Sequence, residues 1–350
     1  MSKNINVGLI GYGFSGRTFH APVITTIPHL KLKKVVQRNS MSAKERYPSV
    51  EVVDNVQNVY LDKDIDLIVI TTPSTNHFKF IKEALLAGKH VVVEKPFTPY
   101  SREADELIDL AKEQGKMLSV FHNRRWDGDF LTIREMLQNN MLGNLIEAEF
   151  RWEGFSPTIN PESWRDSSAV GSGVLYDLGV HLLDQALCLF GVPKTIKADV
   201  RMVRDGAETV DYFNLTLSYK DGFNVNVKSS MLAKEPGPRY TIHGSKGSFV
   251  KYGVDPQEEL LKKRKTPASP DWGREEKDKW GKLNTSVNNL HFVGLVETIP
   301  GSYQSYYQNV YDHISGLADL IVKPEQARMS VYLIEMALKS HREQRTVEVT

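Results

Sequence analysis

The sequence predicts an α/β half followed by an α+β half, and three observations carry that prediction. Residues 5–121 alternate short apolar runs with amphipathic segments, which is typical of a parallel sheet with right-handed crossovers. Residues 194–251 instead read as strand after strand with short turns, which favours a largely antiparallel sheet. Each half also carries one glycine-rich turn followed by a helix pattern, at residues 11–16 and 171–173.

The first half has the pattern of a doubly wound nucleotide-binding sheet. Ligands of such sheets bind beyond the carboxyl ends of the strands, so the loops after the strands are the places to search for a site. The expected strands are Ile5–Ile10, Leu32–Gln37, Leu67–Thr71, His90–Glu94 and Met117–Phe121, with helices at Asn76–Ala87 and Ser101–Gln114.

The second half is expected to be a mixed sheet faced by helices. Helices are predicted up to Gln138, at Val174–Phe190 and at Gln326–Arg342, and Thr346–Val349 is expected to add an edge strand. Residues 253–300 are charged and punctuated by Pro and Gly, so we expect them to form an irregular flap. The expected strands are Lys194–Val203, Val210–Tyr219, Phe223–Met231, Arg239–His243 and Ser248–Lys251. Together these patterns predict a first domain over 1–123 and a second over 124–350.

Composition narrows the class of protein. A chain of 350 residues can build two domains, each with its own core. A formal net charge of +1 provides no basic field, so nucleic acid is not an expected partner. The single cysteine, Cys188, excludes an intrachain disulfide and is expected to be a small buried hydrophobe. No apolar run reaches transmembrane length and the N-terminus lacks a signal-like apolar region, so we expect a cytoplasmic protein away from membranes.

The first glycine-rich turn has the spacing and context of a dinucleotide site. It follows an apolar strand and precedes a helix pattern, which is the context that a G-x-G-x-x-G motif requires. The first glycine allows the turn, the second lets the backbone approach a pyrophosphate, and the third allows close helix packing. An ordinary glycine turn is the alternative. The expected cofactor contacts are Gly11, Tyr12, Gly13, Phe14, Ser15 and Gly16.

The loop after the second strand favours NADP as the cofactor, with NAD as the alternative. An acidic residue about 20 residues past the glycines would accept hydrogen bonds from the 2′-hydroxyl of NAD. None is present, and Arg38, Asn39 and Ser40 instead offer a planar cation and polar groups suited to a 2′-phosphate. The alternative for Arg38 is a solvated surface arginine.

The next two loops supply further candidates. After the third strand, Pro73 stiffens the turn, and Thr72, Asn76 and His77 lie near the cofactor; for His77, helix capping or a surface contact is an equal alternative. After the fourth strand, a lysine held by a following proline could stabilise negative charge on a substrate oxygen. Lys95 and its neighbour Glu94, which could pair with Lys95 or with a ribose, are the candidates there.

Two more clusters are ambiguous on pattern alone. Arg124, Arg125 and Trp126 follow the fifth strand, where they could bind a polar ligand or form an ion-paired hinge between the domains, and Asn123 beside them is an expected cofactor contact. Asp177 and His181 lie four residues apart on an otherwise apolar helix, so they project from one face. Such a carboxylate can orient a histidine that acts as a general base, and a purely structural pair is the equal alternative. With no third ligand in sight, no metal is expected.

At this point the chain resembles a known family. Gly11-x-Gly13-x-x-Gly16, Glu94-Lys95-Pro96 and Asp177-x-x-x-His181 are similar to motifs of the glucose–fructose oxidoreductase, inositol dehydrogenase and rhizopine catabolism (Gfo/Idh/MocA) family. A narrower resemblance is to the NADP-dependent scyllo-inositol dehydrogenases, through residues 119–127, 175–185, 209–213 and 301–307.

The resemblance implies a Rossmann domain followed by an open-faced, largely antiparallel mixed sheet that assembles into a homodimer or homotetramer. It implies reversible oxidation of a secondary alcohol on a cyclic polyol or sugar. In that mechanism His181 takes the hydroxyl proton, Asp177 supports the resulting cation, and Lys95 holds the substrate oxygen. The expected substrate contacts are Lys95, Asn123, Arg124, Trp164, Arg165, Asp177, His181 and Tyr306.

Two competing functions remain open at this point. One is a dehydrogenase or reductase of a different sugar, and the other is a non-catalytic NADP sensor of the same fold. Binding alone needs none of Lys95, Asp177 and His181, so their joint presence favours an enzyme over a sensor.

Overall fold

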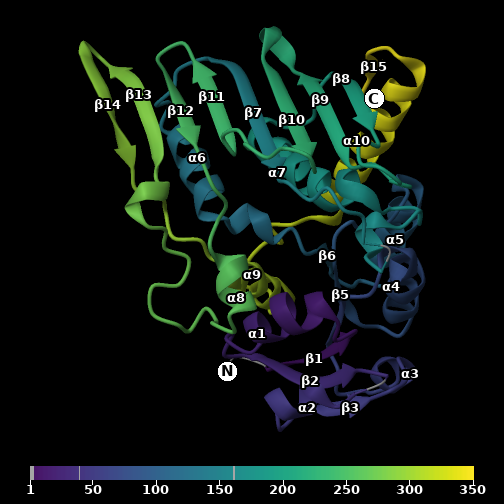
Figure 1. Cartoon of the computed structure of the whole chain (residues 1–350). Helices are drawn as coiled ribbons and strands as arrows, with labels where there is room; N and C mark the ends of the chain where they lie inside the picture. The colour runs from purple at the N-terminus through teal and green to yellow at the C-terminus, as the bar shows by residue number, and fades with distance from the viewer. Residues whose placement is uncertain (1–3, 39, 161) are drawn as a thin grey trace. The chain divides into compact units, whose positions relative to one another are not determined.

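A computed structural model describes residues 4–38, 40–160 and 162–350 of the chain (Figure 1). The chain divides into two compact units, and neither is one continuous stretch of sequence. Unit 1 comprises residues 1–126, 257–272 and 302–328, and unit 2 comprises residues 127–256, 273–301 and 329–350.

Unit 1 is built on a six-stranded sheet in the order β3-β2-β1-β4-β5-β6, and every neighbouring pair of these strands is parallel. This confirms the doubly wound parallel sheet that the alternating pattern predicts. The central strands are almost wholly apolar because they are buried on both faces. The strands are β1 (Ile5–Ile10), β2 (Leu30–Val36), β3 (Glu51–Val53), β4 (Leu67–Ile70), β5 (His90–Val93) and β6 (Leu118–Val120).

Helices of unit 1 come from distant parts of the sequence. From the late segments, α9 places Tyr306, Tyr307 and Val310 in the same apolar core as Phe121 and Trp126. The α-helices are α1 (Ala21–Ile24), α2 (Ser42–Arg46), α3 (Gln57–Tyr60), α4 (His77–Leu86), α5 (Ser101–Glu113), α8 (Gln257–Lys262) and α9 (Gln304–Ile314).

Unit 2 is built on a nine-stranded sheet in the order β14-β13-β12-β11-β7-β10-β9-β8-β15 (Figure 1). The β7–β10 pair is parallel and the other neighbouring pairs of these strands are antiparallel, which confirms the mixed, largely antiparallel sheet. The strands are β7 (Leu145–Glu153), β8 (Thr195–Arg201), β9 (Tyr212–Ser218), β10 (Asn224–Ser230), β11 (Tyr240–Gly244), β12 (Gly247–Lys251), β13 (Gly281–Val287), β14 (Leu290–Val296) and β15 (Val347–Glu348).

The sheet of unit 2 has one covered and one open face. Along β10, Val225 and Val227 are buried while Asn224, Asn226 and Lys228 are half-buried, which is the alternation of a sheet with one covered face. The covered face packs on α6 (Gly128–Gln138), α7 (Val180–Phe190) and α10 (Pro324–Glu343), whose apolar side chains belong to the same core.

Three expectations from the sequence are wrong. Residues 253–300 are not an irregular flap, because they contain α8, β13 and β14. Backbone pairing of β13 to β12 and of β14 to β13 forms these strands. Strand β14 was not predicted because its apolar alternation is weak and its side chains are mostly exposed at the edge of the sheet. Strands β3 and β7 were not predicted either, since both mix charged with apolar residues. Finally, Cys188 is exposed, because the last turn of α7 directs it away from the core that Leu182 and Leu183 enter.

Within the described ranges, none of the helices combines the length and the apolar character needed to cross a membrane.

Two glycines of the first turn provide a matched pair of variants. A Cβ on Gly16 would lie 2.3 Å from the Gly11 carbonyl oxygen, whereas a Cβ on Gly13 would meet nothing within 4 Å. Gly16→Ala should therefore lower the free energy of unfolding by about 1–3 kcal/mol. Gly13→Ala should change it by less than about 0.5 kcal/mol. Urea unfolding of the ligand-free proteins measures both, and equal losses would contradict the close packing of helix on strand.

Candidate active site

The glycine-rich turn of unit 1 can receive a phosphate. Gly11 directly follows β1 and has φ +98°, a value that favours glycine, and Gly16 begins a π-helical turn, η1 (Gly16–His20). The open space around Gly13 leaves its backbone accessible, while Gly16 closes against Gly11. On the next loop the Thr72 hydroxyl is buried and has no hydrogen-bond partner among the described residues. An accessible backbone turn beside a buried, unused hydroxyl fits a dinucleotide.

A buried carboxylate at the end of β5 organises this part of unit 1. Glu94 accepts a hydrogen bond from the Ser15 hydroxyl, and its Oε1 lies 2.9 Å from Nε2 of His20. The Lys95 backbone N–H donates to Oε2 at 3.0 Å. On the other side of the ring, Nδ1 of His20 lies 2.6 Å from the Tyr307 hydroxyl. When His20 is neutral and donates from Nε2, the Tyr307 hydroxyl must donate to Nδ1.

This network keeps Glu94 ionised. Burial alone would raise its pKa, but the hydrogen bond and charge of His20, the charge of Lys95 and the Ser15 hydroxyl together outweigh burial and lower the pKa to about 2. Sequence reasoning missed His20 and Tyr307 as members of this network, because each is far in sequence from Glu94. The one signal was that Tyr307 lies in residues 301–307, which carry the narrower resemblance.

His77 contacts two of the loops that carry candidate residues, the loop after β4 and the turn after β5. It is 1% exposed, so the expected surface contact is wrong. Its Nδ1 lies 2.9 Å from the Pro96 carbonyl oxygen, and its Nε2 lies 3.0 Å from the Thr72 carbonyl oxygen. Burial lowers the pKa of His77 more than these carbonyls raise it. The ring therefore ties the loop after β4 to the turn after β5, where Lys95 is half-buried and precedes a cis peptide bond to Pro96.

The remaining cofactor candidates are placed as follows. The loop after β2 is ordered by Gln37, whose side-chain amide donates to Ser40 and Ser42 at 2.6 and 2.9 Å. Arg38 and Ser40 are exposed, and Asn39 lies outside the described residues. Pro73, Asn76 and Phe14 are exposed and Tyr12 is buried.

Three expected substrate contacts lie in the interior of unit 1. Asn123 and Arg124 are buried in the short turn η3 (Asn123–Trp126). The Arg124 guanidinium donates to the Tyr303 hydroxyl at 3.1 Å and forms an ion pair with Glu258 of α8. Tyr306 is 1% exposed, and its hydroxyl donates to Ser119 Oγ at 3.0 Å. Both Arg124 and Tyr306 thus have partners within unit 1.

In unit 2 the glycine turn leads into two helical segments rather than the single predicted helix. A π-helical turn, η5 (Leu175–Gly179), precedes α7 and carries Asp177, while His181 lies in the first turn of α7. Both side chains are buried, at 4% and 5% exposed. The His181 ring also contacts the Trp152 ring of β7, with centroids 6.1 Å apart. Local π-helical turns are frequent at functional sites.

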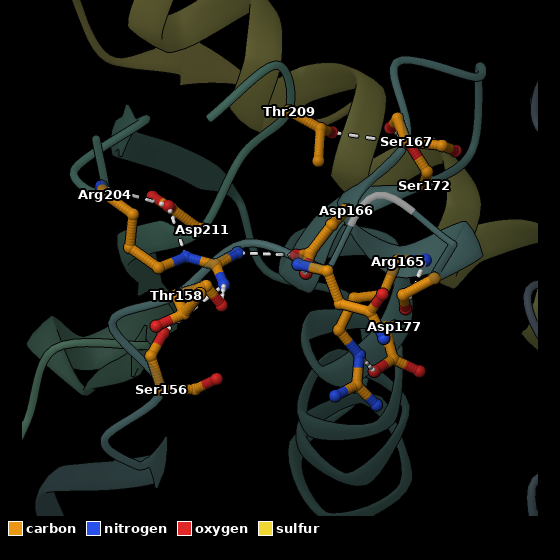
Figure 2. A network of polar contacts seen from close by, with 12 residues as sticks. Ser156, Thr158, Arg165, Asp166, Ser167, Ser172, Asp177, Arg204, Thr209 and Asp211 are labelled. Atoms are coloured by element: carbon orange, nitrogen blue, oxygen red, sulfur yellow. Dashed lines mark hydrogen bonds and ion pairs between the residues drawn. The ribbon is translucent and has the colours of Figure 1, made fainter. Parts of the chain in front are cut away.

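Arg165 contacts Asp177 from an irregular loop (Figure 2). Its Nε lies 2.5 Å from Asp177 Oδ2, and its side chain is 45% exposed against 5% for Asp177. It belongs with Trp164 to the short turn η4 (Trp164–Asp166), and Trp164 is exposed as well. The structure thus brings two expected substrate contacts, Arg165 and Asp177, together.

A buried arginine holds that loop in place (Figure 2). Arg204 donates from Nη2 to Asp166 at 2.6 Å and from Nε to Asp211 at 2.9 Å. Its side chain is 3% exposed and that of Asp211 is fully buried, so both charges depend on each other. Since Asp166 follows Arg165 directly, the Arg204 pairs define where Arg165 lies. Sequence reasoning missed Arg204; its one signal was Asp211, which belongs to a motif that carries the family resemblance.

Comparison with known proteins shows the family to which the chain belongs. Residues 5–122 match the family model for the NAD-binding Rossmann fold of the Gfo/Idh/MocA oxidoreductases, and residues 134–349 match the model for their C-terminal alpha/beta domain. The chain belongs to this oxidoreductase family and carries its NAD-binding domain.

Individual relatives cover nearly the whole chain. It is 43% identical over 347 residues to the uncharacterized oxidoreductase YdgJ of Escherichia coli, covering 99% of both chains. It is 37% identical over 343 residues to the scyllo-inositol 2-dehydrogenase (NADP(+)) IolW of Bacillus subtilis, covering 98% of this chain and 95% of IolW. The solved structure of YvaA from Bacillus subtilis superposes with a TM-score of 0.96 at 36% identity, covering 100% of this chain and 99% of YvaA.

In the described ranges, no three His, Cys, Asp or Glu side chains gather as metal ligands.

The depressed pKa of Glu94 predicts a pH-dependent contribution to stability. A carboxyl whose pKa falls on folding stabilises the protein above its unfolded pKa, here 4.5, and loses that effect as the pH falls to about 2. Glu94→Gln should therefore lower the free energy of unfolding by about 3 kcal/mol at pH 7 and by much less at pH 3. Urea unfolding at both pH values measures the difference, with the exposed Glu106→Gln as control. An equal loss at pH 7 and pH 3 would contradict the assignment.

Proposed function

We propose that the protein is an NADP-dependent dehydrogenase that oxidises a secondary alcohol of a cyclic polyol of the inositol type, or of a sugar. The observation that carries the proposal is the buried Asp177 and His181 of unit 2, with the exposed Arg165 on Asp177. Burying a carboxylate and an imidazole among apolar side chains is costly, and catalytic sites are places where that cost is met. Kinship with IolW supports the inositol class.

Each residue has a proposed role. His181 accepts the hydroxyl proton, and Asp177 stabilises the imidazolium that results. Lys95, held at the end of β5 beside Glu94, donates to the substrate oxygen. Arg165, Trp164 and Asn123 are proposed substrate contacts, whereas Arg124 and Tyr306 are proposed to support the site through their partners in unit 1.

The cofactor is proposed to lie on the glycine-rich turn. Residues 11–16 would hold its pyrophosphate, and Thr72, Pro73, Asn76, His77 and Glu94 would border it. Arg38 and Ser40 would contact the 2′-phosphate of NADP. When bound, the nicotinamide accepts the carbon-bound hydride, and the protein supplies position and electrostatics.

We further propose that residues 1–123 bind the cofactor, and that residues 124–350 bind the substrate and assemble the protein into a homo-oligomer. The open face of the unit 2 sheet supports the assembly. It carries a hollow of about 200 Å³ lined by Glu149, Arg151, Asn214, Asn226 and Lys228. Carboxylate and cationic groups side by side suit a self-complementary contact between two copies.

The test is an assay of the purified protein against inositols and sugars with NADP and with NAD. We expect turnover of a cyclic polyol with a preference for NADP. Arg38→Ala should weaken NADP selectively, by about 1.5–3 kcal/mol in binding, because it removes a charge-assisted contact. Lys31→Ala, which removes an exposed cation from β2, the strand before the Arg38 loop, is the control. Equal turnover with both cofactors contradicts the role of Arg38, and no turnover of any polyol or sugar favours the sensor.

The Asp177–His181 assignment predicts a change in pH dependence. Oxidation should fall at low pH, because a protonated imidazole cannot accept the hydroxyl proton. Asp177→Asn removes the charge that favours the imidazolium, so the acid limb of kcat/KM should move to lower pH while its maximum falls. The measurement is the pH–rate profile together with the melting temperature. A lowered Tm with an unmoved acid limb would mean that the pair is structural.

A further inference from the structure

Arg239 is a buried cation, and two of its side-chain nitrogen atoms, Nε and Nη2, donate no hydrogen bond to the described residues. It immediately precedes β11 in unit 2 and is 4% exposed. Its Nη1 donates to the Arg151 carbonyl oxygen at 2.7 Å. Within the part of the chain that the structure describes, nothing accepts a hydrogen bond from Nε or Nη2, although both atoms are buried.

Such an arrangement is costly unless a ligand completes it. A buried arginine normally has a carboxylate partner, as Arg204 has in Asp166 and Asp211 of the same unit. Around Arg239, among the described residues, no carboxylate oxygen forms an ion pair with the guanidinium. Aromatic faces stabilise the charge instead, since Cζ lies 4.3 Å from the Trp152 ring centroid and 5.0 Å from that of Tyr240. Those rings orient the guanidinium but cannot satisfy its N–H groups.

The unused edge has a defined chemistry. Nε and Nη2 lie on one side of the guanidinium plane and donate in parallel, which is the geometry that binds two adjacent oxygen atoms. A carboxylate presents such a pair of oxygens, and so do two neighbouring hydroxyl groups of a polyol.

The edge also belongs to the surroundings of the proposed base. Trp152 contacts both the His181 ring, at 6.1 Å between centroids, and Arg239. Arg239 and His181 therefore both contact the same side chain, the indole of Trp152. A ligand whose hydroxyl meets His181 can present its other oxygens nearby.

We propose that Nε and Nη2 of Arg239 bind two adjacent oxygens of the substrate, either a vicinal diol or a carboxylate. This inference rests on the proposed function and assigns a residue of unit 2 to the recognition of an oxygen pair on that substrate. Arg239 serves as a substrate-binding residue, and Trp152 positions it.

The experiment compares Arg239→Met and Arg239→Lys with the native protein in saturating NADP. The control is Arg201→Met, which alters an exposed arginine that also stacks on an aromatic ring, Tyr212, at 4.2 Å. The probes are scyllo-inositol, whose oxygen pairs are all vicinal hydroxyls, and cyclohexanecarboxylate, whose one oxygen pair is its carboxylate. Readouts are Tm without probe, the rise in Tm with each probe, and kcat and KM for any compound turned over.

We expect Arg239→Met to keep the native Tm without probe, because it removes a buried charge that the protein does not pair. It should lose the Tm rise with the effective probe and raise KM by about 10–100-fold, with a smaller change in kcat. Arg239→Lys should not restore binding to a diol, since lysine lacks the parallel donors. The probe that raises the native Tm identifies the oxygen pair as diol or carboxylate.

The results that would overturn the role of Arg239 differ from those that would overturn the proposed function. If Arg239→Met retains the native Tm rise and KM, or if neither probe raises the native Tm, the substrate-binding role is overturned. A Tm that falls in Arg239→Met far more than in Arg201→Met, with KM unchanged, makes the residue structural. If no polyol or sugar is turned over, the proposed function fails, while a Tm rise that depends on Arg239 still supports an oxygen-pair site.

Discussion

The structure of unit 1 around its candidate site depends on one buried charge, the carboxylate of Glu94. Burying it is tolerable only because His20 and Ser15 donate to it, and both come from the turn and helix that follow β1. His20 in turn contacts Tyr307 of α9, a helix that enters unit 1 almost 300 residues later in the sequence. A single ionised group thus links the end of β5, the glycine-rich turn and a distant helix, and the backbone of Lys95 is tied to the same carboxylate.

In unit 2 a buried charge is again compensated by its partners, but here the central charge is positive. There a buried arginine, Arg204, is compensated by Asp166 and Asp211, and the result is that an otherwise irregular loop acquires a defined position. That loop delivers Arg165 to Asp177 (Figure 2). Lys95 of unit 1 is half-buried and Arg165 of unit 2 is exposed, and a buried ion pair holds the segment on which each of them lies, whereas Asp177 and His181 are themselves buried. Rigid support behind an accessible group is what positioning a reactive atom requires.

The sequence was sufficient for the fold class and for the residues in motifs, because both are local signals. Alternating apolar runs predict five of the six strands of the parallel sheet, and the spacing of Gly11, Gly13 and Gly16 predicts the turn. It was insufficient where contacts join distant segments. No local pattern pairs His20 with Tyr307, or Arg204 with Asp166, and no pattern reveals β14, which is held by backbone pairing at the edge of the sheet. Residues 257–272 and 302–328 join unit 1 for the same reason, since their contacts are made far from their place in the sequence.

Compensation of buried charge also explains why Arg239 is unusual. Glu94 and Arg204 both have partners within their own units, and their removal should destabilise the protein. Arg239 has aromatic faces and one carbonyl, so the protein itself gains little from its Nε and Nη2. A residue kept at a cost to stability is explained when a ligand supplies the missing acceptors. The change in stability on substitution therefore separates two classes of buried charge. Removal of Glu94 or Arg204, which hold the site together, should destabilise the protein, whereas removal of Arg239, proposed to bind a ligand, should not.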